Sequence, residues 1–535
     1  MTDGKLNLLH EGLITTAPLG GLSLPGVLAA LSRDEVDSFP ALRPHQAPLW
    51  HMFLVQLAAL ALHRAGDQEI PADEETWRRL LRGLTSKFPN DEPWCLVVED
   101  RSKPAFMQPP VPKGVSLDKS VPSPDALDLL ITSKNHDLKQ AIARAGQPED
   151  WIFALVSLQT GEGYGGAGNQ GISRMNGGSS SRPMMSLAPV SQSRTKELAP
   201  RAGVWFQRDL RVLIETREAI LAEMPFGYPC VDGVGLTWLE IWNEGEQLEL
   251  RNLDIWFIEV CRRTRLSIRE NAIIGSKGTS KSTRINAKQF KGAVGDPWAP
   301  VHRVENKNFT LSGGDFDYRT VVTLFLSGDW SRPLLANPAS FEDQQTTLAL
   351  IMAALSRGNS KTEGFKSRII PIGGKIIRSL GPRRSELHEL AQDQISIIKD
   401  FDKALSNALV LIAARGDSEK INQNLYPLTR SARDHLDRYA DEIFFEHLWA
   451  AFEAQEAGAE ALKAEQQAFA AALWKRTQPI FYQFLPSMPC PGLYRPRAEA
   501  RAVRKLEASV RKAHPELFSF SATSKMNREG ETDAT

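Results

Sequence analysis

Apolar residues recur at helical spacing along the last third of the chain. Four such segments, bounded by turn residues, cover about 385–414, 428–455, 458–484 and 497–513. In the first, Leu387, Leu390 and Ile398 fall near one side of a helix. Four amphipathic helices with short connections are typical of a helical bundle. We therefore predict a C-terminal four-helix bundle over residues 385–515, followed by a disordered tail over 520–535.

The larger N-terminal part of the chain mixes helical and strand patterns. Helical spacing predicts helices over 46–64, over 72–86, from near Trp205, and over 341–356. Short β-like runs occupy 236–242, 253–260 and 319–326, the apolar run Ile152–Leu158 is compatible with a strand, and 357–384 is predicted as a basic loop segment. The predicted fold class is therefore α+β: a large mixed N-terminal domain with long loops over 1–380, followed by the C-terminal four-helix bundle.

Residues 161–182 interrupt these patterns with a glycine-rich segment, GEGYGGAGNQGISRMNGGSSSR. Eight of its 22 residues are glycine and four are serine, and no amphipathic period runs through it. Because glycine lacks a side chain, a loop of this composition lets the backbone approach a partner closely. The segment is therefore a candidate for contact with a nucleic-acid backbone or groove.

The start of this segment, Gly161–Gly166, also satisfies the GxGxxG pattern of dinucleotide sites. In such sites the glycines open a helix whose N-terminus receives the pyrophosphate. Here further glycines follow, which disfavour a helix, and no acid stands near Ser181 to bind a ribose. A nucleotide-binding enzyme that uses Gly161–Gly166 is the alternative function.

Charge is separated along the chain, although 64 Lys and Arg balance 64 Asp and Glu over the 535 residues. Residues 261–310 hold eleven basic and three acidic residues, residues 357–384 hold eight and one, and residues 385–465 hold eight and sixteen. The two basic segments are candidates for phosphate contacts. The alternative is a solvated surface whose opposite charges offset one another within the fold.

Three short polar stretches are candidates for the same kind of contact. Each has an ordinary structural alternative: a surface loop, a surface hairpin, or a helix C-cap and turn. They are the loop with Lys134, Asn135, His136 and Lys139, the lysines Lys288 and Lys291 on a predicted hairpin before the GDPW turn at 295–298, and the loop tip Asn359, Ser360 and Lys361 beyond the predicted 341–356 helix. Inserted beside a base step, such a tip could hold two strands apart.

The sequence lacks the common signatures of catalysis and metal binding. It contains no HExxH, GxSxG or Walker A pattern, and its ten histidines do not cluster at metal-ligand spacing. The four cysteines form no CxxC pair, which fits a reducing, cytoplasmic setting. The most apolar stretch, 49–62, is too short to span a bilayer. We therefore expect a binding protein with no cofactor and no metal, rather than an enzyme.

Five short motifs follow one another in an order that resembles the large subunit (CasA family) of the type I-E CRISPR surveillance complex Cascade. They are the N-terminal stretch Asn7–Ile14, the stretch Pro104–Gln108, the loop Gly165–Gly178, the GDPW turn, and Leu350–Met352 leading to Arg357–Asn359, with the terminal four-helix bundle after them. No single motif is specific, and their order over most of the chain carries the resemblance.

The resemblance implies a non-catalytic subunit of an RNA-guided antiviral complex. Such a subunit recognises the protospacer-adjacent motif (PAM) in double-stranded DNA, promotes duplex opening and R-loop formation, and provides the docking site for a helicase–nuclease. Its partners would be the target DNA, the guide RNA through the complex, the backbone, 5′-handle-capping and small subunits, and the helicase–nuclease, with no membrane. In other RNA-guided systems, too, protein reads the PAM and base pairing reads the rest.

The same resemblance implies which residues meet the DNA. The glycine loop corresponds to Gly165, Gly166, Gly168 and Asn169, the hairpin lysine to Lys288 or Lys291, and the wedge to Asn359, Ser360 and Lys361. Lys134, Asn135, His136 and Lys139 correspond to a loop near the guide's 5′ handle and the PAM. The wedge departs from the family pattern, which has a glutamine at the tip. With the shorter Ser360, either Lys361 helps to wedge or the PAM preference differs.

Overall fold

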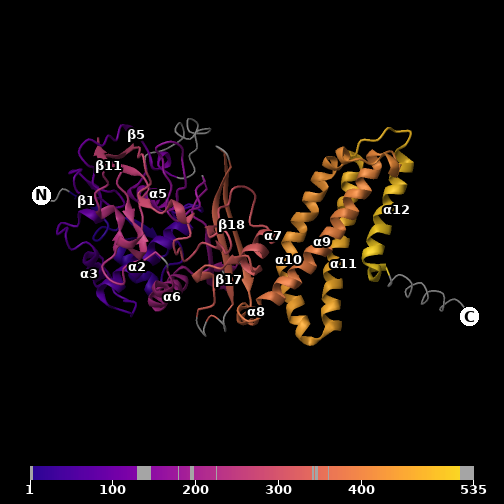
Figure 1. Ribbon diagram of the computed structural model, residues 1–535, viewed down its shortest axis with the longest axis horizontal. Helices are drawn as coiled ribbons and strands as arrows, with labels where there is room; N and C mark the ends of the chain where they lie inside the picture. Colours follow the sequence, from indigo (N-terminus) through magenta and orange to yellow (C-terminus); the bar gives the residue numbers. More distant parts are fainter. Residues whose placement is uncertain are drawn as a thin grey trace, which may run out of the picture. The chain divides into compact units, whose positions relative to one another are not determined.

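The computed structural model describes residues 4–128, 146–178, 180–192, 198–224, 226–339, 343, 347–358 and 361–518. As predicted, these residues form an α+β fold, and the chain divides into two compact units (Figure 1). The first unit comprises residues 1–316 and 329–378, and the second comprises residues 317–328 and 379–535, as far as they are described. The second unit thus takes in a short segment from the middle of the chain, which the predicted boundary near residue 380 left in the N-terminal domain.

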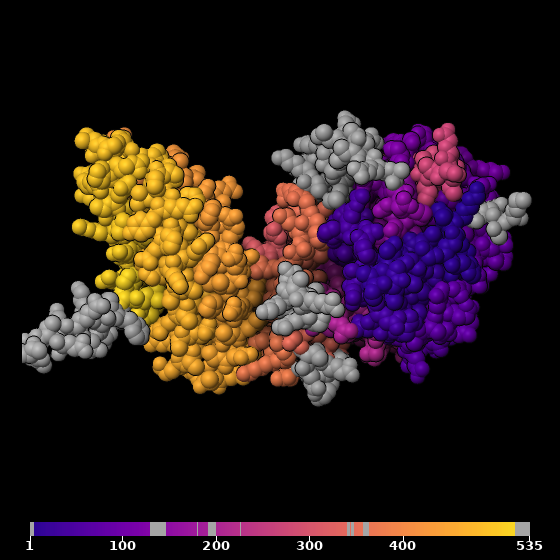
Figure 2. Space-filling view, turned by 180° about the vertical axis from the view of Figure 1, so that it is seen from behind, coloured from indigo at the N-terminus to yellow at the C-terminus, as the bar shows by residue number. Residues whose placement is uncertain are grey.

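A buried helix, α2 (Ala47–Ala65), lies at the centre of the first unit. Thirteen of its 19 residues are buried, and the ring of Trp50 stacks on Phe53 with centroids 5.5 Å apart. The helices α3 (Glu74–Leu84), α5 (Pro148–Gly161) and α6 (Ala202–Glu223) pack against α2, and α1 (Leu24–Ser32) packs on α3 and α6. The predicted helices over 46–64, over 72–86 and from near Trp205 are confirmed. Figure 2 shows that N-terminal residues cover much of one face of this unit.

Helix α5 corrects one prediction, because the run Ile152–Leu158 is helical and not a strand. Every residue from Trp151 to Gly161 is buried. A helix that is buried on all sides has no polar face, so its sequence cannot be distinguished from that of a buried strand by periodicity. The helix begins with a capping bond, in which Gln147 N donates to Asp150 Oδ2 at 2.8 Å, and it leads directly into the glycine-rich segment.

The three longest described strands, with the short β7, pair in a four-stranded antiparallel sheet with the order β18-β17-β6-β7 (Figure 1). They are β6 (Met184–Gln192), β7 (Leu198–Pro200), β17 (Leu348–Gly358) and β18 (Lys361–Ile372), and the short helix α8 (Gly374–Ser379) follows. The predicted helix over 341–356 and the basic loop over 357–384 are therefore wrong. The run Leu348–Leu355 is rich in Leu, Ala and Met, which favour a helix locally. It forms a strand because β6 and β18 supply backbone partners on both sides and bury it.

Shorter strands form small sheets in the same unit. Among the described residues, four of them are two-stranded: β1 (Gly4–Asn7) with β4 (Cys95–Val98), β2 (Ile14–Thr16) with β3 (Gly20–Leu22), β8 (Val234–Leu236) with β10 (Leu253–Ile258), and β9 (Leu248–Glu249) with β13 (Ile285–Asn286). Two others in the described chain are three-stranded. In one, β12 (Ala272–Gly278) lies between β5 (Lys119–Val121) and β11 (Arg263–Arg269), and in the other, β14 (Val301–His302) lies between β15 (Lys307–Asn308) and β16 (Trp330–Ser331). The predicted run 253–260 is confirmed as β10. The run 236–242 instead leaves β8 for a 3-10 turn, where the Thr237 hydroxyl donates to Ile258 O at 3.0 Å.

Four long helices pack together in the second unit (Figure 1). They are α9 (Arg384–Ala413), α10 (Arg430–Ala457), α11 (Ala459–Phe484) and α12 (Arg495–Ala513), which match the four predicted segments to within a few residues. Leu387, Leu390 and Ile398 are buried, as their spacing predicts. Gly416 after α9 has φ 76°, and Gly458 between α10 and α11 has φ 122°, so both breaks use backbone conformations that favour glycine.

The predicted strand at 319–326 is wrong, because α7 (Tyr318–Val321) continues into a turn of π-helix at Val322–Leu326. The ring of Tyr318 stacks on Phe444 of α10 with centroids 4.7 Å apart, and its hydroxyl donates to Asp437 Oδ1 at 3.0 Å. These contacts hold the segment in the helical unit, although its Val- and Thr-rich sequence favours a strand locally. Residues 520–535, the predicted tail, lie outside the described residues. No helix in the described part of the chain is long and apolar enough to cross a membrane.

Candidate nucleic-acid interface

The glycine-rich segment leaves the end of α5 and is shaped by its own backbone hydrogen bonds. Gly163 N donates to Ser180 O at 3.1 Å, and Tyr164 N donates to Gly178 O at 2.7 Å. The two ends of the segment therefore lie side by side. The described residues from 163 to 180 contain no helix and no strand, which agrees with the predicted long loop.

The tip of the segment is a tight turn with two left-handed glycines. It holds the predicted contact residues Gly165, Gly166, Gly168 and Asn169, and Gly165 N donates to Asn169 O at 2.9 Å. Gly166 has φ 103°, and a Cβ on it would meet nothing within 4 Å, so its backbone is open to a partner. A Cβ on Gly168 (φ 76°) would lie 2.6 Å from Thr279 Cβ. Glycine at 168 therefore serves packing within the chain, whereas Gly166 has the open space that contact with DNA needs.

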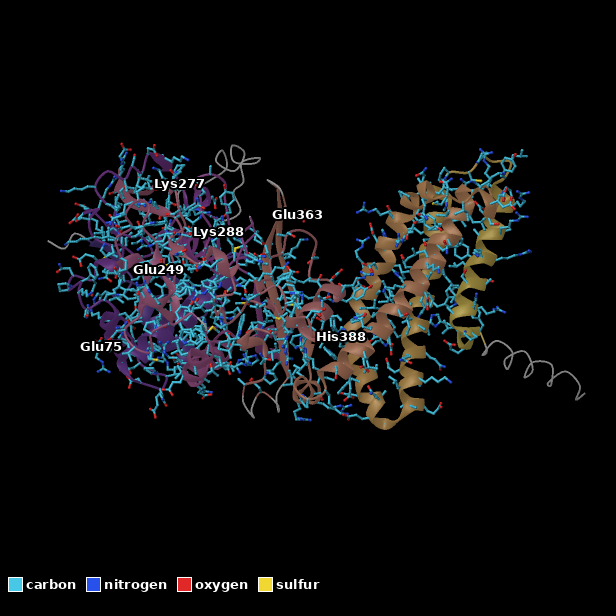
Figure 3. All side chains as sticks on the ribbon, viewed as in Figure 1. Glu75, Glu249, Lys277, Lys288, Glu363 and His388 are labelled. Carbon is cyan, nitrogen blue, oxygen red and sulfur yellow. The ribbon has the colours of Figure 1, made fainter. Side chains whose placement is uncertain are left out.

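The lysines Lys288 and Lys291 lie on a 3-10 turn, and not on the predicted hairpin (Figure 3 labels Lys288). β13, which precedes the turn, pairs in parallel with β9. Lys291 (φ 48°) and Gly292 (φ 82°) then reverse the chain. A Cβ on Gly292 would lie 2.6 Å from the backbone carbon of Met175, so this glycine lets the lysine turn pack directly on the glycine-rich segment. Both lysines are exposed and form no ion pair with a described residue.

A cleft of about 680 Å³ opens between the glycine-rich segment and the residues around the lysine turn. Its floor is apolar and buried, and its rim carries exposed cations and an aromatic ring. The floor residues include Ile172, Met175, Ile285 and Ala287, the rim residues are Tyr164, Lys281, Lys288 and Lys291, and the amides of Gln170 and Asn176 also line the cleft. The fold thus brings together two predicted contact segments that are far apart in the sequence.

Sequence reasoning missed two of the rim residues, Tyr164 and Lys281. Tyr164 is the one aromatic residue among 161–182, and Lys281 lies in the first basic segment. Both signals were present in the sequence. What the sequence could not show is that the two residues line the same cleft.

Beneath the glycine-rich segment lies a layer of buried charges that pair with one another. The carboxylate of Glu259 accepts from Ser173 N at 2.9 Å, and it lies 3.8 Å from Nη1 of Arg174. Burial raises the pKa of Glu259 and lowers that of Arg174. Arg182 forms a bidentate pair with Asp296, with N···O distances of 2.6 and 2.8 Å. Because these charges balance, the positive potential at the mouth of the cleft comes from the rim lysines.

Two arginines of the first basic segment, Arg265 and Arg284, are buried and donate to backbone carbonyls inside the protein. Arg265 donates to the carbonyls of Val98, Asp100 and Lys103 at 2.9 Å each. Arg284 donates to the carbonyl of Glu240 at 2.9 Å. Burial lowers the pKa of each guanidinium to about 10. Both alternatives considered for this segment are therefore wrong for these two residues, which join loops inside the protein.

The β17–β18 hairpin is tied to the end of the glycine-rich segment. Ser180 Oγ donates to Leu355 O at 2.6 Å, and Leu355 N donates to Ser181 Oγ at 2.8 Å. These bonds hold the end of β17 beside the glycine-rich segment. The predicted wedge residues Asn359 and Ser360 fall between the two strands, outside the described residues, and the side chain of Lys361 is likewise not described.

Glu363 forms a β-bulge near the end of this hairpin (Figure 3). The pairing steps from Ser356↔Gly364 to Arg357↔Thr362, which leaves Glu363 without a partner on β17. Its carboxylate accepts from Gly314 N at 3.2 Å and from Ser356 Oγ at 3.4 Å. A bulge bends its strand, so these two hydrogen bonds, which hold the bulge in place, set the direction in which the hairpin leaves the sheet.

The GxGxxG pattern does not have the geometry of a dinucleotide site. Gly161 is the last residue of α5, so the pattern stands at the C-terminal end of a helix. The next helix in the described chain begins only at Ala202. The C-terminal end of a helix carries partial negative charge and repels a pyrophosphate. This geometry opposes the alternative of a nucleotide-binding enzyme that uses Gly161–Gly166.

Two further predictions concern other residues. Lys134, Asn135, His136 and Lys139 all lie outside the described residues. Among the residues that the structure describes, no three His, Cys, Asp or Glu side chains gather in a group that could hold a metal ion.

Comparisons with known proteins concern mainly the fold. No protein-family model matches the chain, and no curated protein matches its sequence. Among solved structures, CasA (Cse1) of Thermus thermophilus superposes with a TM-score of 0.60 and 13% identity, covering 95% of this chain and 100% of its own. The CRISPR-associated protein Cse1 from Acidimicrobium ferrooxidans gives a TM-score of 0.59 and 12% identity, with 96% and 99% covered. Thermobifida fusca Cse1 gives 0.58 and 12%, with 95% and 98% covered.

Nearly the whole length of this chain and of each of those proteins takes part in the match. The similarity therefore extends over both units and is not confined to the helices of the second unit. Few residues are identical, so the likeness is one of fold. The resemblance drawn from the sequence is confirmed at this level, and the chain has the fold of the CasA (Cse1) proteins.

Proposed function

We propose that this chain is the non-catalytic large subunit of a type I-E Cascade. In this role it recognises the PAM in double-stranded DNA, promotes duplex opening and R-loop formation, and provides the docking site for the helicase–nuclease. One observation carries the proposal: in a chain with the CasA (Cse1) fold, the glycine-rich segment and the exposed lysines line one cleft, and hydrogen bonds join the end of the same segment to β17.

The residues at this surface have the chemistry that PAM recognition needs. Lys288 and Lys291 are exposed and form no ion pair with a described residue, so they can neutralise DNA phosphates. The open backbone at Gly166 can approach the floor of a groove, where a side chain would be in the way. Reading from the minor groove is degenerate, so we expect this subunit to accept several PAMs.

The β17–β18 hairpin supplies the wedge in this proposal. Asn359, Ser360 and Lys361 stand where the chain passes from β17 to β18. Two residues after Lys361, the hydrogen bonds of Glu363 support the hairpin. Inserted beside the PAM, this tip separates the first base pairs so that the guide RNA can pair with the target strand. Lys134, Asn135, His136 and Lys139 contact the region of the guide's 5′ handle.

The remaining features of the proposal follow from the same assignment. The chain works in the cytoplasm with the guide RNA, which is held by the complex, and with the backbone, 5′-handle-capping and small subunits. Cleavage of the target belongs to the helicase–nuclease, so this subunit needs no cofactor of its own.

A gel-shift comparison of two duplexes tests PAM recognition. The chain is assembled with its RNA-guided partners and mixed with a duplex that carries a PAM or with one in which the PAM is scrambled. We expect tighter binding to the PAM duplex, and we expect Lys288→Ala with Lys291→Ala to abolish this preference. Lys87→Ala, which alters an exposed lysine outside the cleft, is the matched control. Equal binding of both duplexes by the unaltered complex would remove the PAM role.

A second variant tests the wedge. Replacing Asn359, Ser360 and Lys361 by alanine should lower the rate of duplex opening, measured by permanganate reactivity of unpaired thymines. Assembly of the complex and binding of closed PAM duplex should be unchanged, because the tip acts after recognition. Unaltered opening in this variant would show that the strands are separated elsewhere.

A further inference from the structure

We propose that the cleft beside Tyr164 binds an unstacked nucleotide of single-stranded DNA at the edge of the opened duplex. This inference rests on the proposed function, because it assigns a ligand to a part of the same surface. It goes beyond recognition of the PAM, which concerns a closed duplex.

The shape of the cleft favours a nucleotide that has left the stack. A duplex is read by protein groups that protrude into its grooves, and the cleft is instead a hollow. A base can enter a hollow only after it has been pulled out of the helix. The cleft volume of about 680 Å³ lies in the range of about 300–1,000 Å³ that small-ligand sites occupy.

One wall of the cleft is suited to a base. Tyr164 is 45% exposed, and its hydroxyl forms no hydrogen bond with a described residue. Single-strand binding proteins stack bases on exposed aromatic rings of this kind. Ile172 and Ile285 line the floor, which makes the bottom of the cleft apolar. The Asn176 amide, also without a partner among the described residues, can reach a base edge.

The other wall is suited to the sugar–phosphate backbone. Lys281, Lys288 and Lys291 come from the segment opposite Tyr164, and all three are exposed. The backbone N–H of Lys281 donates to Glu244 Oε1 at 2.9 Å, while its ammonium group forms no ion pair with a described residue. The described residues that line the cleft include no Asp or Glu. A strand can therefore lie with its phosphates along the lysines and one base turned towards Tyr164.

The location of the cleft agrees with this ligand. The glycine-rich segment that carries Tyr164 is joined through Ser180 and Ser181 to Leu355, three residues before Gly358 at the end of β17. In the proposed function the hairpin tip separates the strands. The first unpaired nucleotides then form next to the segment that bears the aromatic ring.

Binding to forked DNA tests the inference. The full-length protein is titrated against a duplex with a short single-stranded arm that contains 2-aminopurine, against the same duplex with blunt ends, and against free dAMP. We expect tighter binding to the fork, with quenching of 2-aminopurine as it stacks. Tyr164→Ala should weaken fork binding about fivefold or more and leave blunt-duplex binding unchanged, as expected for the loss of one stacked base. Tyr164→Phe should retain fork binding, because it keeps the ring.

The control is Tyr482→Ala, which removes a tyrosine that is 56% exposed in the second unit. If Tyr164→Ala weakens fork and blunt duplex equally, or weakens neither, the cleft does not hold an unstacked nucleotide, while PAM recognition stands. Equal affinity for free dAMP and for the fork would assign the cleft to a mononucleotide and overturn the strand. If the unaltered protein binds no DNA, alone or in the complex, the proposed function fails together with this inference.

Discussion

Strand β11 and the rim of the cleft belong to the same basic segment of the chain, but they use their positive charges in opposite ways. On β11, Arg263 and Arg265 are buried and donate to backbone carbonyls. On the rim, Lys281, Lys288 and Lys291 are exposed, and their ammonium groups form no ion pair with a described residue. Positive charges of one basic segment are thus used inside the fold at some positions and stay exposed at others.

The difference teaches that the net charge of a segment is a poor guide to its surface. A guanidinium has five donors in a rigid fork, so it can satisfy several carbonyls inside a protein. An ammonium is compact and strongly hydrated, so it stays at the surface unless it has a specific partner. In this chain the distinction between Arg and Lys separates internal cations from candidate phosphate contacts more clearly than the charge count does.

The largest expected effect is on stability, from Arg265→Ala. The variant leaves the carbonyls of Val98, Asp100 and Lys103 without this donor, which should lower the free energy of unfolding by about 2–4 kcal/mol. Urea unfolding followed by circular dichroism measures the loss. Lys281→Ala should change the same quantity by less than about 0.5 kcal/mol. Similar losses of unfolding free energy in the two variants would show that internal and rim cations contribute alike to stability.

The next effect is on DNA binding, from Lys288→Ala combined with Lys291→Ala. Each phosphate contact that is lost should reduce the slope of log affinity against log salt by about 0.9. Fluorescence anisotropy at several salt concentrations should therefore show a slope lower by about two, with urea unfolding unchanged. An unchanged slope would mean that the rim lysines do not touch phosphates.

The smallest expected effect is on the pH dependence of stability, from Lys277, a half-buried lysine on β12 that lies between the buried arginines and the exposed rim lysines in its degree of burial (Figure 3). Burial, with repulsion from Lys119 and Arg262, lowers the pKa of Lys277 below its ordinary value of 10.5. Between the two values the unfolded state holds more protons than the native state, so the free energy of unfolding contributed by Lys277 rises with pH. Lys277→Met should remove this rise, measured as the difference between the two proteins in urea unfolding at neutral pH and near pH 10.5. The same pH dependence in both proteins would place Lys277 with the solvated rim lysines.

Helices and strands were predicted best from the sequence where one face of the element is buried and the other is exposed to solvent. The four helices of the second unit and the helix over 72–86 follow this rule, and their positions were predicted closely. Prediction from the sequence failed where an element is buried on all sides, as for α5 and β17, because no polar period remains to show the type of structure. It also failed at 319–326, where contacts with α10 outweigh the local preference for a strand.

The candidate site shows the same division. The glycine-rich segment and the lysines Lys288 and Lys291 could be singled out by composition alone. Their meeting at one cleft could not, because it depends on Gly292, which lets the lysine turn pack on Met175. Nor could composition reveal that Gly168 is needed for packing against Thr279, while Gly166 remains open.

The sequence by itself determined the fold class, the four C-terminal helices and the segments that hold the candidate contacts, because each depends on residue types at short spacing. The tertiary structure decided which cations stay at the surface, which end of a helix the GxGxxG pattern occupies, and which segments share a cleft. Those outcomes depend on contacts between residues that are distant in the chain. Their energies arise only once the strands and helices have packed.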